Sequence, residues 1–211
     1  MTMFKLGFLD DDTNNRTTFE RQFGDAFNLW VFNNLSEVRS LQNLLEKVNA
    51  EKLDALAIDY QLSGNGSLQY DGNDVVDYFE KNKKYFPIFI VTSYLSDAVD
   101  DIYDVYIVND KDKVENEEYR KELIEKVKKS IKSYRRRIKD IEDKTICLEK
   151  KQRSQEGLTP NEEKELYSLH SEMNKIDPKA NPVSAEQLGT SYIKDLRELV
   201  KNSRELLNRL S

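Results

Sequence analysis

Residues 5–12 read Lys-Leu-Gly-Phe-Leu-Asp-Asp-Asp, a short apolar run that ends in three carboxylates. An apolar run of this length with charge at its end is typical of a strand that is buried on both faces. The residues that follow place Arg16, Phe19 and Phe23 at helical spacing. The stretch therefore predicts a strand followed by a helix, with acidic groups at the carboxyl end of the strand.

The same alternation repeats along the first half of the chain. Each further apolar run is followed by a polar or helical segment, and the β-α-β-α order predicts a five-stranded parallel sheet, doubly wound, with helices on both faces. The remaining strands are expected at 27–32, 53–58, 87–91 and 105–108. Helices are expected at 13–23 and 35–48, around 75–79, and as a short helix near 96–102.

Polar residues at the strand ends form one candidate site, because ligands of such sheets bind at the carboxyl ends of the strands. Asp10 and Asp11 end the first strand, Asp59 the third and Thr92 the fourth, and Lys111 lies just beyond the fifth. Crowded carboxylates suit a hard cation such as Mg²⁺. A carboxylate can also form an acyl phosphate, and Mg²⁺, an ammonium and a hydroxyl would stabilise the transferring group.

A structural explanation of the acidic residues stands beside the chemical one. Asp12 or Thr13 could cap the first helix, and Asp71 or Asn73 could cap the third, because short polar side chains accept hydrogen bonds from the first backbone amides of a helix.

Four motifs in order resemble the receiver domain of two-component response regulators. They are GFLDDD after the first strand, AIDYQL at the third, IVTS at the fourth and a lysine after the fifth. The resemblance covers residues 4–113, about half of the chain, and it implies a flavodoxin-like fold.

The resemblance also implies roles for individual residues. Asp59 would be the phosphoacceptor and also a ligand of Mg²⁺, together with Asp10, Asp11 and the backbone carbonyl of Gln61. Thr92 would be the switch hydroxyl. Lys111 would contact the phosphoryl group, and a histidine kinase or phosphotransfer protein would donate it. The only enzymatic activity implied is phosphoryl self-transfer and its hydrolysis.

Two departures from the family pattern concern the fifth strand. Tyr106 lies where the family often has a switch aromatic, but that alignment puts Asn109 at the lysine position, with Lys111 and Lys113 only near it. Asp112 stands where a proline usually follows the lysine. The sequence therefore leaves open a receiver-like scaffold that is not phosphorylated.

The second half of the chain has the pattern of long helices. Thr159-Pro160-Asn161-Glu162 is a capping box, and a last helix is expected at about 190–210. We expect a receiver-like domain at 1–113, a long helix or coiled-coil stalk at 114–155 and a C-terminal helical region at 156–211. The part after residue 113 is expected to be an all-α coiled coil or helical hairpin. A heptad seam typical of a coiled coil runs through Val127, Ile131, Tyr134, Ile138, Ile141, Thr145 and Leu148.

Charge is divided between these parts. The net charge is −6, but residues 1–113 hold 11 Lys and Arg against 20 Asp and Glu, a net of −9. Residues 120–153 hold 14 against 6, a net of +8. This basic helix is the basis of an alternative function, binding of nucleic acid. The absence of a helix-turn-helix pattern favours a protein partner or a second copy of the chain instead.

Composition excludes several classes of protein. No apolar run approaches the roughly 20 residues of a membrane span, and the first residues lead directly into a strand, so no secretory signal is expected. Cys147 and His170 are the only residues of their kinds, which excludes a disulfide framework and fits a reducing compartment. The sequence thus predicts a cytoplasmic, homodimeric response regulator without a DNA-binding domain.

Overall fold

The computed structural model describes residues 3–64, 66–94, 98 and 108–177. The chain divides into two compact units, Met1–Arg137 and Ile138–Ser211. The boundary falls inside one long helix, so each unit contains part of it.

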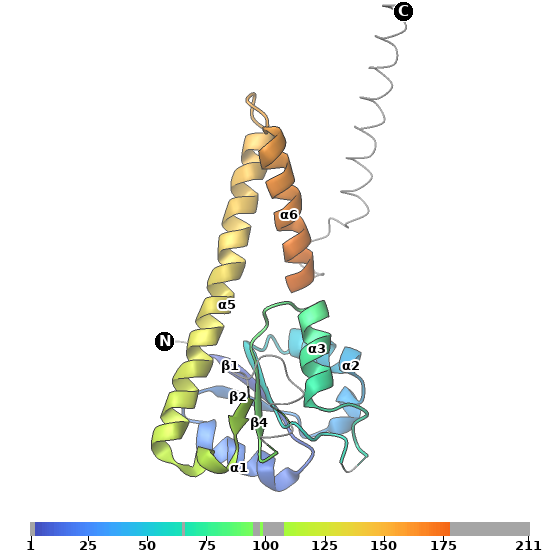
Figure 1. Ribbon diagram of the computed structural model, residues 1–211, viewed down its shortest axis with the longest axis vertical. Coiled ribbons are helices and arrows are strands. Elements are labelled where there is room, and N and C mark those ends of the chain that lie inside the picture. Colours follow the sequence, from blue (N-terminus) through green and yellow to red (C-terminus); the bar gives the residue numbers. More distant parts are fainter. Residues whose placement is uncertain (1–2, 65, 95–97, 99–107, 178–211) are drawn as a thin grey trace, which may run out of the picture. The chain divides into compact units, whose positions relative to one another are not determined.

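The first unit is built on a five-stranded parallel sheet with the order β2-β1-β3-β4-β5. Figure 1 labels β1, β2 and β4 of this sheet. Leu6 of β1 lies opposite Leu29 of β2 on one side and Ala55 of β3 on the other. The predicted doubly wound fold is confirmed. The strands are β1 Lys5–Leu9, β2 Asn28–Val31, β3 Ala55–Ile58, β4 Ile88–Thr92 and β5 Val108–Asp110.

Helices cover both faces of this sheet. On one face, Phe19 and Phe23 of α1 (Thr13–Phe23) share a hydrophobic core with Val127 and Ile131 of α5 (Glu117–Gln152). The core of the other face contains side chains of α2 (Leu41–Ala50) and α3 (Gly72–Asn82). Because both faces are buried, β3 is apolar throughout and β4 is apolar up to Thr92, so both appear as continuous apolar runs in the sequence.

The predicted helix at 35–48 is wrong in one respect, because it is two elements. A 3-10 turn, η1 (Leu35–Val38), comes first, and α2 begins only at Leu41. Ser40 is the N-cap of α2, and its hydroxyl accepts a hydrogen bond from the Asn43 amide at 3.2 Å. Apolar spacing runs through the break because η1 and α2 bury side chains in the same core.

Two predictions at the fifth strand lie outside the described residues: the short helix near 96–102, of which only Ala98 is described, and the switch aromatic Tyr106. The described part of β5 ends at Asp110, two residues later than expected. A 3-10 turn, η3 (Asp112–Glu115), follows, with Lys111 as its N-cap.

The long helix and the hairpin-like second unit agree with the predicted helical region. α5 runs unbroken for 36 residues, and α6 (Pro160–Ile176) opens with the predicted capping box between Thr159 and Glu162. Lys151 of α5 pairs with Glu162 at 2.6 Å, and His170 lies 3.4 Å from Glu149. The coiled-coil seam remains a prediction, and the helix expected at 190–210 lies outside the described residues.

None of the helices in the described ranges combines the length and apolar character needed to cross a membrane.

Candidate functional site

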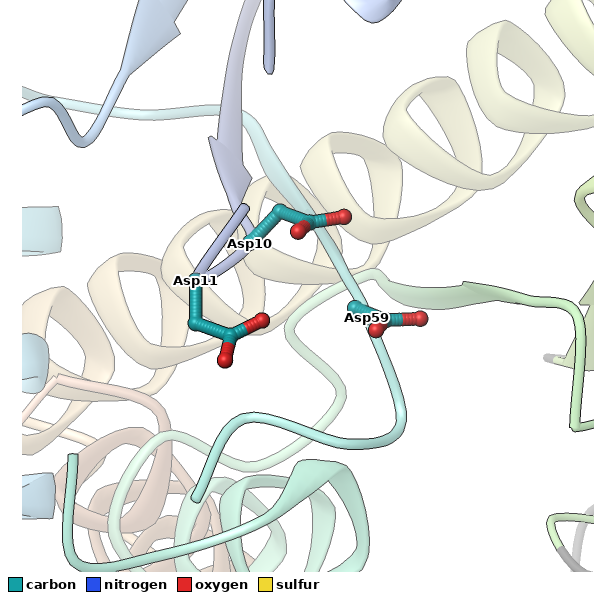
Figure 2. Close-up of side chains that lie close together, drawn as sticks. All are labelled: Asp10, Asp11 and Asp59. Atoms are coloured by element: carbon teal, nitrogen blue, oxygen red, sulfur yellow. The ribbon is translucent and has the colours of Figure 1, made fainter. Parts of the chain in front are cut away.

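Three carboxylates meet at the carboxyl edge of the sheet, where the sequence predicted them. Asp10 and Asp11 follow β1, and Asp59 follows β3, its neighbour in the sheet. One oxygen of each lies within 4.8 Å of the others (Figure 2). Asp10 is fully buried, Asp59 is nearly so and Asp11 is half-buried. The cluster thus faces solvent through Asp11.

Backbone and side-chain donors fix Asp10. Its Oδ1 accepts hydrogen bonds from the Asp12 amide at 2.9 Å and from the Asn15 side chain at 3.1 Å. The guanidinium of Arg16 donates to its backbone carbonyl at 2.6 Å and to the Thr13 hydroxyl at 2.7 Å. A carboxylate held by several donors keeps its orientation when the charge around it changes.

Lys111 provides the positive charge of the site. Its ammonium lies 2.9 Å from Asp10 Oδ2 and 3.3 Å from Asp59 Oδ1. Burial lowers the pKa of Lys111, but the charges of Asp59 and Asp10 outweigh it, so the pKa is raised and the side chain is charged at neutral pH. Lys113 instead pairs with Asp110 at 3.2 Å, and Asn109 is buried beneath the edge of the sheet. Lys111 is therefore the lysine that contacts the carboxylates.

Asp59 combines burial with an incomplete set of donors. Burial raises its pKa most strongly and the charge of Asp10 adds to this, while Lys111 and the Thr92 hydroxyl lower it; the net shift is upward. Its Oδ1 is buried, yet it accepts no hydrogen bond of good geometry within the described part of the chain. The ion pair with Lys111 compensates part of the cost of burying this oxygen, and a bound cation would compensate more.

Thr92 lies at the end of β4 and is fully buried. Its hydroxyl accepts a hydrogen bond from the Tyr94 amide at 3.1 Å, and its carbonyl accepts one from the Lys111 amide at 3.0 Å. A second hydrogen bond joins the segments that follow β4 and β5, because the Ser93 hydroxyl donates to Asp112 at 2.9 Å. Thr92 and Lys111 thus belong to one connected edge of the sheet.

Gln61 lies two residues after Asp59, in the loop that leads to α3. The next two amides, of Leu62 and Ser63, both donate to Asp71 Oδ1 at 2.8 Å. Asp71 is also the N-cap of α3 in a capping box with Asp74. The cap therefore fixes the loop that carries the Gln61 carbonyl, whose role as a metal ligand remains a prediction.

The residues of the cluster fit a magnesium ion. Three carboxylates and a loop carbonyl are hard oxygen ligands of the kind that Mg²⁺ takes while keeping some waters. The buried Asp59 Oδ1, which is paired with Lys111 at 3.3 Å, is a further acceptor for such a cation. Part of the cluster's negative charge is already balanced by Lys111, which leaves room for one divalent ion rather than several.

The order β2-β1-β3-β4-β5 is the flavodoxin-like order of a doubly wound sheet. Its strand ends carry an acidic pair, an aspartate, a threonine and a lysine in that sequence. The first unit has a flavodoxin-like fold. Helices follow this domain, as the sequence predicted.

Comparison with known proteins gives similarity in structure alone. No family model matches the sequence, and no curated protein matches it. A signal receiver domain of an HD domain-containing protein from Pseudomonas fluorescens Pf-5 is 11% identical, with a TM-score of 0.46, over 63% of this chain and 90% of that one. A response regulator receiver protein from Sinorhizobium medicae WSM419 is 18% identical, with a TM-score of 0.43, over 62% and 95%. The receiver domain of Nitrogen Regulatory Protein C is 20% identical, with a TM-score of 0.44, over 64% and 99%.

Sequence reasoning missed one residue that supports the site. The sequence shows Arg16 only as part of a helical stripe, but it is buried and donates a hydrogen bond to the backbone carbonyl of Asp10. An arginine on the apolar face of a helix, six residues after an aspartate, was the available signal, because a buried guanidinium needs acceptors nearby.

The basic helix binds its own domain through two of its three consecutive arginines. Arg135 Nε donates to Asp54 at 3.1 Å, and its guanidinium lies 5.0 Å from the centre of the Phe4 ring. Arg137 lies 3.7 Å from the centre of the Tyr85 ring and donates to the Tyr85 hydroxyl at 2.9 Å. This part of the positive charge is engaged within the first unit.

Proposed function

We propose that this chain is a response regulator in which Asp59 accepts a phosphoryl group and the C-terminal helices carry the output. The observation that supports this most directly is the Asp59 Oδ1 atom, buried beside two carboxylates and 3.3 Å from Lys111. Helix capping would not require an aspartate that is buried beside two other carboxylates and a lysine.

In the proposed reaction, an Asp59 carboxylate oxygen attacks the phosphorus of the donor. A phosphorus–oxygen bond to Asp59 forms while the bond from phosphorus to the donor's leaving group breaks, and the leaving group departs with the electron pair. With acetyl phosphate as donor, the products are acetate and an aspartyl phosphate. Hydrolysis by water later returns Asp59 and inorganic phosphate.

The chain's own residues would hold the transferred group. Asp10, Asp11, Asp59 and the Gln61 carbonyl would hold Mg²⁺, which neutralises charge on the phosphoryl oxygens when it is bound. The Lys111 ammonium is charged at neutral pH. It would exchange its ion pair with Asp59 for one with a phosphoryl oxygen. The Thr92 hydroxyl would donate to another of these oxygens.

Output would pass through the helices to a second copy of the chain or to another protein. α5 begins close to the site in sequence and continues unbroken into the second unit. A change in its position therefore acts on both units at once. In this proposal the phosphoryl donor is a histidine kinase or phosphotransfer protein, and the chain catalyses nothing except its own phosphorylation and dephosphorylation.

Incubation with acetyl phosphate and Mg²⁺, followed by intact-mass spectrometry, tests the proposal. The wild type should gain one acid-labile phosphoryl group, and Asp59→Asn should gain none. Asp12→Asn is the matched control, because Asp12 lies beside the cluster but caps α1, and asparagine also caps helices well. An unmodified wild type, or equal labelling of Asp59→Asn, would contradict the proposal and favour the scaffold hypothesis.

The nucleic-acid alternative receives no support from the described residues. Two of the three consecutive arginines contact Asp54, Phe4 and Tyr85. If binding occurred through this helix, retention on DNA or RNA would fall steeply with salt, and absence of retention at low salt would remove the alternative.

A further inference from the structure

The last residues of β5 are fastened to α5 by two polar contacts immediately before Lys111. β5 is an edge strand. The Lys111 amide points toward β4, where it donates to Thr92, so the preceding amide of Asp110 points away from the sheet. It donates to the Tyr119 hydroxyl of α5 at 3.1 Å. The Tyr119 hydroxyl therefore accepts the hydrogen bond that a carbonyl of a further strand would accept.

The second contact involves a buried amide. Asn109 is 5% exposed, and its side-chain nitrogen donates to the Ile90 carbonyl of β4 at 3.2 Å. Its side-chain oxygen accepts a hydrogen bond from the Lys126 ammonium of α5 at 3.1 Å. A cation that reaches a buried amide over this distance makes a charge-assisted bond, which is stronger than a neutral one.

The two contacts join one side of α5 to one short stretch of β5. Tyr119 and Lys126 are seven residues apart, which is two helical turns, so they lie on the same side of α5. Asn109 and Asp110 are consecutive, and the next residue is Lys111. The ammonium of Lys111 is in turn in contact with Asp10 and Asp59.

We propose that Tyr119 and Lys126 are positioning residues for Lys111, and that the same two contacts couple the occupancy of the site to α5. The inference rests on the proposed function. A phosphoryl group on Asp59 adds negative charge, and Lys111 moves to meet it. The end of β5 moves with Lys111, and Tyr119 and Lys126 pass the displacement to α5. By linkage, a partner that holds α5 in one position alters phosphorylation of Asp59.

The test compares two pairs of substitutions in the full chain. Tyr119→Phe with Lys126→Met removes both contacts but keeps the ring and the length of the aliphatic chain. Tyr78→Phe with Lys121→Met is the matched control, because it removes a tyrosine hydroxyl bonded to Gln42 of α2 and a lysine paired with Glu117 of α5. Unfolding in urea is measured for all variants, so that a general loss of stability is recognised.

Without any ligand, amide hydrogen exchange and ¹⁵N resonances report on the positioning role. The Tyr119/Lys126 pair should speed exchange of the Asp110 amide about three- to tenfold, the effect of losing one hydrogen bond, and should shift the Lys111 amide resonance. The control pair should do neither. The single substitution Lys126→Arg, with Tyr119 unchanged, should leave the Lys111 resonance where it is in the wild type, since arginine keeps the positive charge. An unchanged Lys111 resonance in the Tyr119/Lys126 pair would overturn the positioning role.

With Mg²⁺ and beryllofluoride, a phosphoryl analogue, the resonances report on coupling. In the wild type, amides near Tyr119 and Lys126 should shift together with those of the site. In the Tyr119/Lys126 pair, the site should still respond, the response of α5 should fall by at least half, and labelling by acetyl phosphate at saturating donor should slow about three- to tenfold. An α5 response equal to that of the wild type would overturn the coupling.

Failure of the proposed function gives a different result. A wild type that neither takes up a phosphoryl group nor responds to beryllofluoride contradicts phosphorylation of Asp59, and the coupling then fails with it. The positioning of Lys111 is decided independently by the ligand-free measurements.

Discussion

Replacement of Asp59 by asparagine is expected to raise the free energy of unfolding of the first unit when Mg²⁺ is absent. The Asp59 carboxylate is largely buried, and burial is the main reason that its pKa is raised. Asparagine has nearly the same size and carries no charge, so the substitution removes the cost of burying a charge without opening a cavity.

Burial raises the pKa of Asp59 most, and three nearby charges modify the magnitude of the effect. Oxygens of Asp10 and Asp11 lie within 4.8 Å of Asp59, which at an effective dielectric of about 20 means about 3.5 kcal/mol of repulsion from each. Lys111 lies at 3.3 Å, which means about 5 kcal/mol of attraction on the same scale. The balance is about 2 kcal/mol against the charged form. Solvent screening reduces it and desolvation adds to it, so the expected gain is about 1–3 kcal/mol.

Urea unfolding in EDTA, followed by fluorescence of Trp30, measures this gain. Trp30 is the only tryptophan and lies in β2. Because the native pKa of Asp59 lies above 3.8, the carboxyl is protonated in both states below about pH 3.8 and contributes nothing there. The advantage of asparagine should therefore appear as pH rises through the native pKa.

Two further results belong to the same experiment. Mg²⁺ should stabilise the wild type and should stabilise Asp59→Asn less, while Asp12→Asn should behave like the wild type. If Asp59→Asn is no more stable than the wild type at pH 7 in EDTA, the carboxylate is not under the electrostatic strain that the geometry implies.

The remaining predictions concern packing, the approach to the site and the second unit. Ile131→Ala should lower the free energy of unfolding in urea by about 2–5 kcal/mol because Ile131 is fully buried. Ile146→Ala, on the exposed side of α5, should change this free energy by no more than about 0.5 kcal/mol. Gly72→Ala should cost about 1–3 kcal/mol and slow phosphoryl labelling, since an added Cβ would lie 2.9 Å from the Asp59 carbonyl; equal labelling would refute the close approach. Thr159→Ala should lower the stability of α6 by about 0.5–2 kcal/mol in thermal melts followed by circular dichroism, through loss of the cap.

Local periodicity predicted most elements because each is stabilised by what it buries. β1 and α1 have the predicted bounds, and the other described strands and α3 lie within a few residues of theirs. The break at Ser40 was missed because the apolar spacing continues across it. A polar side chain such as that of Ser40 can cap a new helix or lie inside a continuous one, and tertiary contacts decide which of the two structures forms.

The sequence by itself determined that Asp10, Asp11 and Asp59 would meet. Carboxyl ends of parallel strands share one edge, so residues at those ends are brought together whatever the details of the loops. The same reasoning placed Thr92 at this edge.

Only the tertiary structure decided which cation joins them. The sequence favoured Lys111 and left Lys113 open, because a lysine side chain is long enough that spacing does not settle its partner. The end of β5 at Asp110, its two contacts with α5 and the η3 turn direct Lys111 into the cluster and Lys113 away from it. That choice depends on residues far apart in the chain, because Tyr119 and Lys126 reach β5 only once α5 has packed against the sheet.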